Sequence, residues 1–234
     1  MAARTSPAET SATACWSCGA TATGEYFCAK CGKIQPLARG ADYFTLLGLP
    51  RKLVVDADDL ERHFHQLSWK LHPDNFMRAG EYERALSLES SSQLNDAFRA
   101  LRDPVSRVEY LLSHAGMRSE GHHKQQAPPE LLEEVFELNE SLDELRDARQ
   151  SGGDAAEMDA LGRRLEAESL KFAEKLDEVD GELAELFTEW DRAMDLGADQ
   201  AAQRMLMDQM NEVLNRRSYI RNLVQSVQRE LAEA

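Results

Sequence analysis

An amphipathic helix pattern that ends abruptly at a proline constrains the fold of this chain more than any other feature. Four apolar residues recur at the spacing of one helix face and predict a buried stripe: Leu60, Phe64, Leu67 and Leu71. Pro73 cannot continue a helix, and it biases His72 away from helical backbone angles. The pattern therefore predicts that His72 and Asp74 lie on a stiff, exposed turn just beyond the helix.

Segments on both sides of this turn predict further helices. Upstream, residues 42–50 indicate a short helix and its exit turn, and downstream, residues 93–104 indicate the end of a longer helix. In that longer helix, Ala97, Phe98 and Leu101 would pack on the helix that carries the apolar stripe. The three segments, in this order, resemble the J-domain, the module that docks on DnaK-type chaperones and triggers their ATP hydrolysis.

The resemblance implies roles for the turn and for the helix before it. His72, Pro73 and Asp74 would act on the ATPase machinery of the chaperone, and the basic residues Arg62 and Lys70 would meet an acidic surface on it. The chain itself shows no glycine-rich phosphate loop and no nucleophile–base pair. We therefore expect a protein that is not an enzyme and that activates the ATPase of a partner.

The composition argues against nucleic-acid and membrane partners. Acidic residues number 42 and basic residues 27 among 234, a formal charge of −15, whereas phosphate-backbone binding depends on Lys and Arg. No apolar run approaches the length of a membrane span. The first ten residues lack the apolar core of a secretory signal, so we expect a cytoplasmic protein, or one of the mitochondrial matrix if the source is eukaryotic.

The four cysteines fall in one short segment as two Cys-x-x-Cys pairs: Cys15 and Cys18, then Cys28 and Cys31. Two such pairs can present four thiolates at the corners of a tetrahedron, which is the coordination of structural zinc. Four protein ligands leave no open position on the metal, so we expect no catalysis there. Metal binding should supply the folding free energy of so small a segment.

Other uses of the four thiols stay open at this stage. Two disulfides are disfavoured by the missing secretory signal, and a thiol redox pair needs only one Cys-x-x-Cys motif within a βαβ unit. A rubredoxin-like iron site is a further alternative. The role of the segment is also open: it could bind a partner, pack on the J-domain or mediate self-association.

Three long helical patterns follow a stretch that contains several glycines and prolines. They run over residues 130–149, 154–195 and 199–232, and each carries one apolar stripe. Such helices can bury their stripes only against one another, which predicts a bundle. The expected fold is all-α, with a J-domain helical hairpin, a C-terminal three-helix bundle and a small N-terminal zinc knuckle or ribbon. The predicted boundaries are a four-cysteine zinc-binding segment 1–38, a J-domain 41–115, a linker 116–129 and the bundle 130–234.

The first helix of the predicted bundle also carries a second, exposed face. Leu132 and Phe136 lie off its buried stripe, and Tyr219 on the last helix also lies off its own stripe. A row of carboxylates at helical spacing flanks the apolar pair: Glu133, Glu137, Glu140 and Glu144. This combination suits a partner that is apolar in the centre and basic around it. The alternative is a solvated acidic face on which the linker shields Leu132 and Phe136.

At this point the resemblance narrows to the HscB family, the co-chaperones of iron–sulfur cluster assembly. Residues 42–50, 104–112 and 137–144 are typical of that family, and the added four-cysteine segment resembles that of its eukaryotic and some bacterial members. The resemblance implies that the bundle binds an IscU-type scaffold and delivers it to an HscA/DnaK-type chaperone, whose stimulated ATPase promotes cluster transfer. By position, the implied scaffold-binding residues are Leu132, Phe136, Glu137, Glu140, Glu144 and Tyr219.

Two positions depart from the family pattern. Asn75 follows the His-Pro-Asp motif where a lysine is common, and Glu133 stands where an apolar methionine is usual. Two other functions stay open. One is a generic J-protein with another client, and the other is a zinc- or redox-responsive interaction scaffold whose helices oligomerise.

Overall fold

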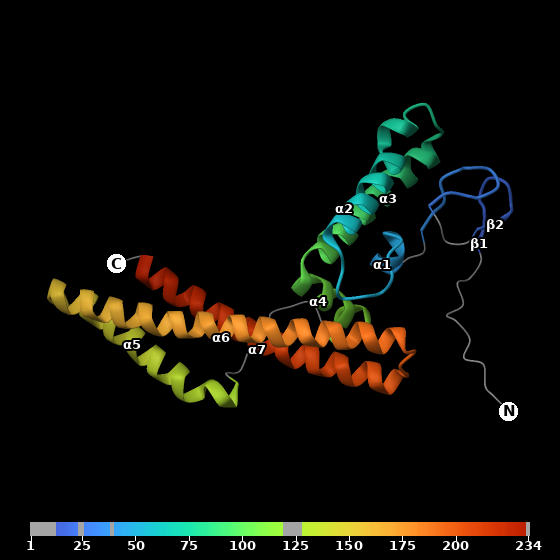
Figure 1. Ribbon diagram of the computed structural model, residues 1–234. Coiled ribbons are helices and arrows are strands. Elements are labelled where there is room, and N and C mark those ends of the chain that lie inside the picture. The colour runs from blue at the N-terminus through green and yellow to red at the C-terminus, as the bar shows by residue number, and fades with distance from the viewer. Residues whose placement is uncertain (1–12, 23–25, 38–39, 119–127, 233–234) are drawn as a thin grey trace. The chain divides into compact units, whose positions relative to one another are not determined.

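The structure is a computed structural model that describes four stretches of the chain: residues 13–22, 26–37, 40–118 and 128–232. They belong to two compact units, Met1–Tyr110 and Leu111–Ala234 (Figure 1). The boundary between the units falls within one helix, α4 (Pro104–His114). The first residues of the predicted four-cysteine segment and most of the predicted linker lie outside the described residues.

The first unit combines two very short strands with the helices of the predicted J-domain. Its elements before α4 are β1 (Thr13–Ala14), β2 (Thr21–Ala22), α1 (Tyr43–Leu46), α2 (Ala57–Leu71), the 3-10 helix η1 (Pro73–Phe76) and α3 (Glu81–Arg102). Asp56 starts α2 because its carboxylate accepts the backbone N–H groups of Asp58 and Asp59. α3 ends before Pro104 because Asp103, the residue that precedes the proline, takes an extended conformation.

α2 and α3 form a helical hairpin around an apolar core (Figure 1). The fully buried residues of both helices share one cluster: Leu60, Leu71, Leu86, Leu94, Ala97 and Leu101. Beside this cluster the rings of Phe64 and Phe98 stack with their centroids 4.2 Å apart. The structure confirms the all-α helical hairpin and the predicted packing of Ala97, Phe98 and Leu101 on α2.

Arg107 fastens the start of α4 to this hairpin. Its side chain is buried, and its guanidinium donates hydrogen bonds to the carbonyl of Leu101 at 2.7 Å and to the carbonyl of Leu53. A buried guanidinium requires such acceptors because it stays charged at any pH that the fold tolerates. The residue that stops α3, Pro104, is also the first residue of α4, so the chain turns directly from one helix into the next.

Tyr110 closes the other side of the first unit. Its ring stacks on the ring of Tyr43 at a centroid distance of 4.3 Å. Its hydroxyl accepts the backbone N–H of Tyr43 at 2.9 Å and donates to the Asp42 carboxylate at 3.1 Å. Because Asp42 also caps α1, the phenol joins α4 to the first turn of the J-domain.

The second unit is a bundle of three helices after a short 3-10 helix. Its elements are η2 (Pro129–Leu131), α5 (Leu132–Ser151), α6 (Ala155–Asp195) and α7 (Gln200–Ala232). The predicted bounds of the three helices agree with the observed ones to within two residues. Gly152 ends α5 in a left-handed conformation with φ of 69°, which a residue without a side chain adopts at little cost.

The long helices α6 and α7 pack against each other, and α5 packs on α6 (Figure 1). The predicted stripes supply buried residues from all three helices: Val135, Leu138, Leu142, Leu145, Leu165, Phe172, Val179, Leu183, Trp190, Leu206, Met210, Val213, Ile220, Val224 and Val227. At 1.5 Å per residue, the 41 residues of α6 span about 60 Å and the 20 residues of α5 about 30 Å, so α5 covers roughly half of α6. Among the described residues, no helix combines the length and apolar character needed to cross a bilayer.

Two ion pairs, one near each end of α5, show how α5 is aligned with α7. Near the start of α5, Glu130 of η2 lies 3.7 Å from Arg216, and near its end Arg146 pairs with Glu230. α5 and α7 therefore run in the same direction. Tyr219, one turn after Arg216, lies at the level of the first turns of α5.

We expect Tyr110→Phe to lower the free energy of unfolding by about 1–2 kcal/mol, because the Asp42 carboxylate and the Tyr43 amide lose their shared partner. Burial raises the pKa of Tyr110 from 10 to about 12. This part of the stability is thus fully present below about pH 10 and is lost as the pH rises towards about 12.

Urea denaturation of the whole chain near neutral pH and at about pH 12 tests this linkage. The wild type should exceed the variant at neutral pH, and the two should converge in alkali. Tyr82→Phe is the matched control, since its hydroxyl makes no hydrogen bond within the described part of the chain. A constant difference at both pH values would contradict the assignment.

Candidate functional site

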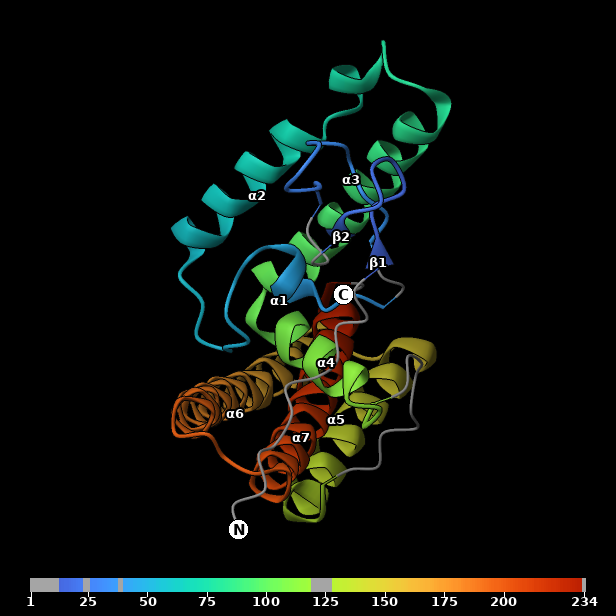
Figure 2. The same cartoon turned by 90° about the vertical axis from the view of Figure 1, so that its right-hand side faces the viewer.

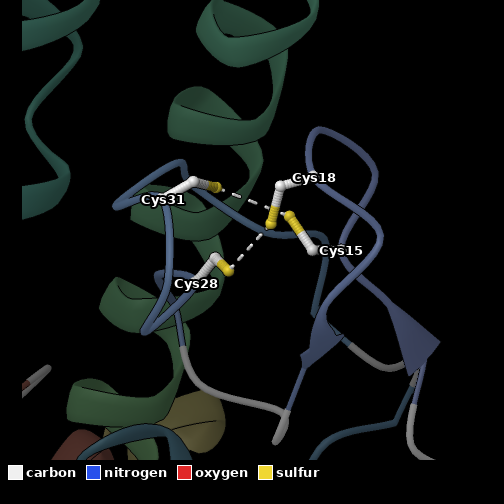
Figure 3. Close-up of side chains that lie close together, drawn as sticks. All are labelled: Cys15, Cys18, Cys28 and Cys31. Carbon is white, nitrogen blue, oxygen red and sulfur yellow. Dashed lines mark hydrogen bonds between the residues drawn. The ribbon is translucent and has the colours of Figure 1, made fainter.

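The four cysteine sulfurs lie close together, as the spacing predicts (Figure 3). All four Sγ atoms lie within 4.8 Å of one another, with 3.7 Å between Cys15 and Cys31 and 3.8 Å between Cys18 and Cys28. Sulfurs that share a tetrahedral zinc ion at the usual bond length of about 2.3 Å are about 3.8 Å apart. A disulfide instead requires about 2.05 Å, and the cysteines are free thiols. The donors and their spacing therefore fit one tetrahedral metal ion.

Each Cys-x-x-Cys pair is folded as a knuckle that a glycine closes. Gly19 and Gly32 follow the two pairs with φ of 67° and 69°, a left-handed conformation that favours glycine. Their amides donate to the carbonyls of Cys15 and Cys28 at 2.9 and 2.8 Å. The two knuckles thus repeat one geometry, and this repetition places the four sulfurs around a common centre.

The knuckles bury two of the four thiols and leave two at the surface. Cys15 and Cys28 are buried, whereas Cys18 and Cys31 are exposed. The backbone amides of Cys31 and Lys30 lower the pKa of the Cys28 thiol by hydrogen bonding to it. A lower pKa favours the thiolate, which is the form that binds a metal.

The His-Pro-Asp motif forms the exposed turn that the sequence predicts. His72 ends α2 with φ of −58° and ψ of 131°, and Pro73 opens η1. The backbone N–H of Asp74 donates to Nδ1 of His72 at 3.3 Å. The side chains of His72 and Asp74 are 55% and 76% exposed, so both are accessible to a partner.

Three side chains hold this turn, and the sequence analysis assigned that role to none of them. Asn75 donates its side-chain amide to the carbonyl of Trp69 at 2.6 Å and thereby caps the last turn of α2. The hydroxyls of Ser87 and Ser91 on α3 donate to the carbonyl of Leu71 at 2.6 and 3.1 Å. These bonds satisfy carbonyls that the end of a helix leaves without amide donors.

The outer face of α2 is only thinly basic. Arg62 is exposed but pairs with Asp59 three residues earlier, whereas Lys70 is exposed and has no ion pair within the described residues. Trp69, at 76% exposure, lies on the same face. His63 turns inward, with its Nδ1 2.8 Å from the carbonyl of Leu47, so it does not extend the basic face.

The predicted surface on α5 is exposed at its centre. Leu132 and Phe136 are 55% and 70% exposed. Glu137 and Glu140 are exposed beside them without ion pairs among the described residues, whereas Glu144 lies 3.4 Å from Arg164 of α6. Of the other predicted residues of this surface, Glu133 is exposed and Tyr219 is half-buried at the level of the first turns of α5. We call Leu132, Phe136, Glu137 and Glu140 the α5 patch.

Comparisons with known proteins agree with this architecture. No family model matches the chain. It is 34% identical over 134 residues to the co-chaperone protein HscB homolog of Vibrio vulnificus strain YJ016. The aligned residues make up 57% of this chain and 78% of the relative. To the HscB homolog of Azoarcus sp. strain BH72 it is 36% identical over 128 residues, 55% of this chain and 70% of the relative.

A solved structure supports the fold. The crystal structure of human co-chaperone protein HscB superposes with a TM-score of 0.61 at 24% identity, over 92% of this chain and 97% of that one. The helical hairpin with its exposed His-Pro-Asp turn and the appended bundle define a J-domain co-chaperone. The identity to the Vibrio relative extends over most of that protein's length. The chain belongs to the HscB co-chaperone family, as the sequence resemblance predicted.

We expect Asn75→Ala to loosen the end of α2, because the carbonyl of Trp69 loses its donor. The loss should cost about 0.5–1.5 kcal/mol of local stability, the usual range for one hydrogen bond. Amide hydrogen exchange of residues 69–76 in the whole chain should become several-fold faster. Asn95→Ala on the exposed face of α3 is the control, and equal exchange in both variants would contradict a capping role for Asn75.

Proposed function

We propose that this co-chaperone serves iron–sulfur cluster assembly. Its bundle binds an IscU-type scaffold, and its J-domain presents the scaffold to an HscA/DnaK-type chaperone and stimulates the ATPase of that chaperone. The observation that supports this most strongly is the pairing of two accessible surfaces in one HscB-family chain, the His-Pro-Asp turn and the α5 patch. The bacterial origin of the curated relatives supports a cytoplasmic location, with the mitochondrial matrix as the eukaryotic equivalent.

The J-domain would contact the chaperone through the end of α2. His72 and Asp74 are accessible and stand on a turn that Pro73 and Asn75 make rigid, so little conformational entropy is lost when they dock. Lys70, which pairs with no acidic group in the described stretches, offers a positive charge beside them, and Arg62 can contribute if it exchanges Asp59 for an acidic group on the partner. With so few fixed charges, electrostatics would tune the association rate more than the affinity.

The α5 patch would contact the scaffold. An exposed phenylalanine beside an exposed leucine is unfavourable in water and suits an apolar pocket on a partner. Glu137 and Glu140 border this pair and form no ion pair with any residue that the structure describes, which suits basic residues around the pocket. Glu144 is held by Arg164 within the bundle, so we expect it to contribute less than Glu137.

We propose that the four cysteines hold zinc in a structural role. Cys15, Cys18, Cys28 and Cys31 would all ligate the ion, and bound zinc would supply four strong bonds to a segment whose only strands are two residues long. The residues of the segment would contribute no chemistry to ATP hydrolysis or cluster transfer.

Binding to the scaffold tests the α5 patch. We expect Phe136→Ala, combined with Glu137→Lys, to weaken the affinity for an IscU-type scaffold by at least about tenfold, because loss of a central aromatic anchor costs about 2 kcal/mol or more. Isothermal titration calorimetry with purified proteins measures the effect. Stimulation of the chaperone ATPase without scaffold should stay unchanged, since the J-domain is intact.

The matched control for this experiment combines one residue of α7 with one residue of α6. Met205 is 60% exposed and precedes Arg216, the residue aligned with the start of α5, by about three helical turns. Met205→Ala with Glu178→Lys removes a similar apolar side chain and reverses one exposed charge outside the patch. Equal scaffold affinity for the patch variant and this control would refute the surface.

Stimulation of the chaperone tests the turn. We expect His72→Gln to abolish the stimulation of the ATPase of an HscA/DnaK-type chaperone while scaffold binding stays at the wild-type level, because His72 is exposed and belongs to the first unit, whereas the α5 patch belongs to the second. Steady-state ATP hydrolysis by the chaperone is the measurement. Undiminished stimulation would favour another function, such as the zinc- or redox-responsive scaffold, for which this residue has no role.

A further inference from the structure

The four-cysteine segment packs on the J-domain through the base of its second knuckle. Lys33 lies 2.8 Å from the carboxylate of Glu83 in the first turn of α3, and the Glu83 side chain is only 10% exposed. Trp16 of the first knuckle meets Tyr82 of the same turn edge-on, with centroids 5.0 Å apart. Lys33 belongs to the stretch that follows β2, and Figure 2 shows this stretch beside α3. Of the roles left open by the sequence, the structure therefore shows packing on the J-domain.

Apolar residues of the knuckle base complete the J-domain core. Ile34 is fully buried and Tyr26 nearly so, and both belong to the cluster that contains Leu71 of α2 and Leu86 of α3. Ile34 stands opposite Phe27 in an isolated β-bridge. The segment is thus a part of the core and not an appendage on it.

The knuckles hold Ile34 in this position. The indole N–H of Trp16 donates to the carbonyl of Ile34 at 2.6 Å, so the first knuckle is tied to the base of the second. Within the second knuckle, the backbone amide of Cys28 donates to the carbonyl of Lys33, the residue before Ile34, at 2.9 Å. The described strands of the segment are only two residues long. Besides its own burial and its bridge to Phe27, the position of Ile34 therefore depends on the two knuckles.

The contacts continue from the knuckle base to the His-Pro-Asp turn. Glu83, Ser87 and Ser91 follow one another at four-residue intervals on one face of α3. Lys33 binds the first of them, and the hydroxyls of the other two donate to the carbonyl of Leu71, which directly precedes His72. One helix face therefore links the cysteine segment to the turn that contacts a chaperone.

We propose that metal binding by the four cysteines orders the His-Pro-Asp turn through Ile34, Lys33 and the first turns of α3. The metal-bound segment holds α3 in register with the end of α2, and loss of the metal releases this constraint and makes the turn mobile. The proposal rests on the metal site of the proposed function and is independent of the identity of the client. It makes the four-cysteine segment a metal-dependent regulator of the J-domain.

Thermodynamic linkage requires that the coupling between metal binding and the first turns of α3 act in both directions. If the metal-bound segment stabilises the first turn of α3, then a residue of that turn must raise the affinity of the cysteines for metal. Glu83 lies 50 residues after Lys33 along the chain and is no ligand, so an effect of its substitution on metal affinity would come from outside the ligand set.

The first experiment is hydrogen exchange followed by mass spectrometry on the whole chain, with zinc bound and after removal by a chelator. Metal removal should accelerate exchange in residues 72–77 and 81–91 at least about fivefold, the lower end of typical coupling strengths. Peptides from α6 should not change. Cys18→Ser with Cys31→Ser, which removes two exposed ligands, should reproduce the result without chelator.

The second experiment measures zinc affinity by competition with a chromophoric chelator. Glu83→Gln and Lys33→Met should each weaken zinc binding by about fivefold or more, whereas the exposed neighbour variant Glu81→Gln should not. Both informative variants keep the four ligands and the apolar contacts, so they should remain folded.

The outcomes separate the two proposals. Zinc bound at one ion per chain, with unchanged exchange in α3 and unchanged affinity in Glu83→Gln, would overturn the coupling but leave the structural metal site. No stoichiometric zinc at all would overturn both the metal site and the coupling. Neither readout uses ATPase activity or scaffold binding, so failure of the co-chaperone function would leave the result intact.

Discussion

The carbonyl of Leu71 is the point on which the arrangement of the J-domain depends. A helix that stops before a proline leaves its last carbonyls without amide donors, and here two serine hydroxyls of α3 supply the missing bonds. Because Ser87 and Ser91 stand one turn apart, they fix the height at which α2 meets α3. The buried stripe of α2, the stacking of Phe64 on Phe98 and the outward direction of the His-Pro-Asp turn all follow from that register.

Sequence reasoning succeeds here where a local pattern determines the result, and it fails where distant residues meet. Period and proline placement were enough to predict the helices of the bundle and the turn after α2, and the Cys-x-x-Cys spacing predicted the sulfur cluster. No such pattern indicates that Lys33 meets Glu83, that Glu144 is held by Arg164, or that His63 turns towards Leu47. A helical wheel shows which side a residue faces, but only the tertiary structure shows what lies opposite. The cap by Asn75 was local and could have been suspected, since an asparagine after a helix end often binds a free carbonyl.

The two surfaces proposed to bind partners differ in charge although the chain as a whole is strongly acidic. The end of α2 carries Lys70 and the α5 patch carries Glu137 and Glu140, and none of these three forms an ion pair with another described residue. Elsewhere acidic groups are often neutralised internally, as Asp59 is by Arg62 and Asp180 by Arg217. A partner of one sign is therefore attracted to one surface and repelled from the other, which discourages each partner from occupying the wrong site.

The docking of the cysteine segment also fixes an order of events during protein synthesis. Residues 13–37 are synthesised before α3, yet Glu83, which receives Lys33, lies in α3, 50 positions later. Until α3 has emerged, the knuckles lack the α3 residues that Lys33 and Trp16 contact. An early metal ion would thus be held by a segment not yet packed on α3, and completion of the hairpin would add these contacts. The N-terminal segment is therefore among the last parts of the first unit to reach its final state, because nascent chains fold as their partners appear.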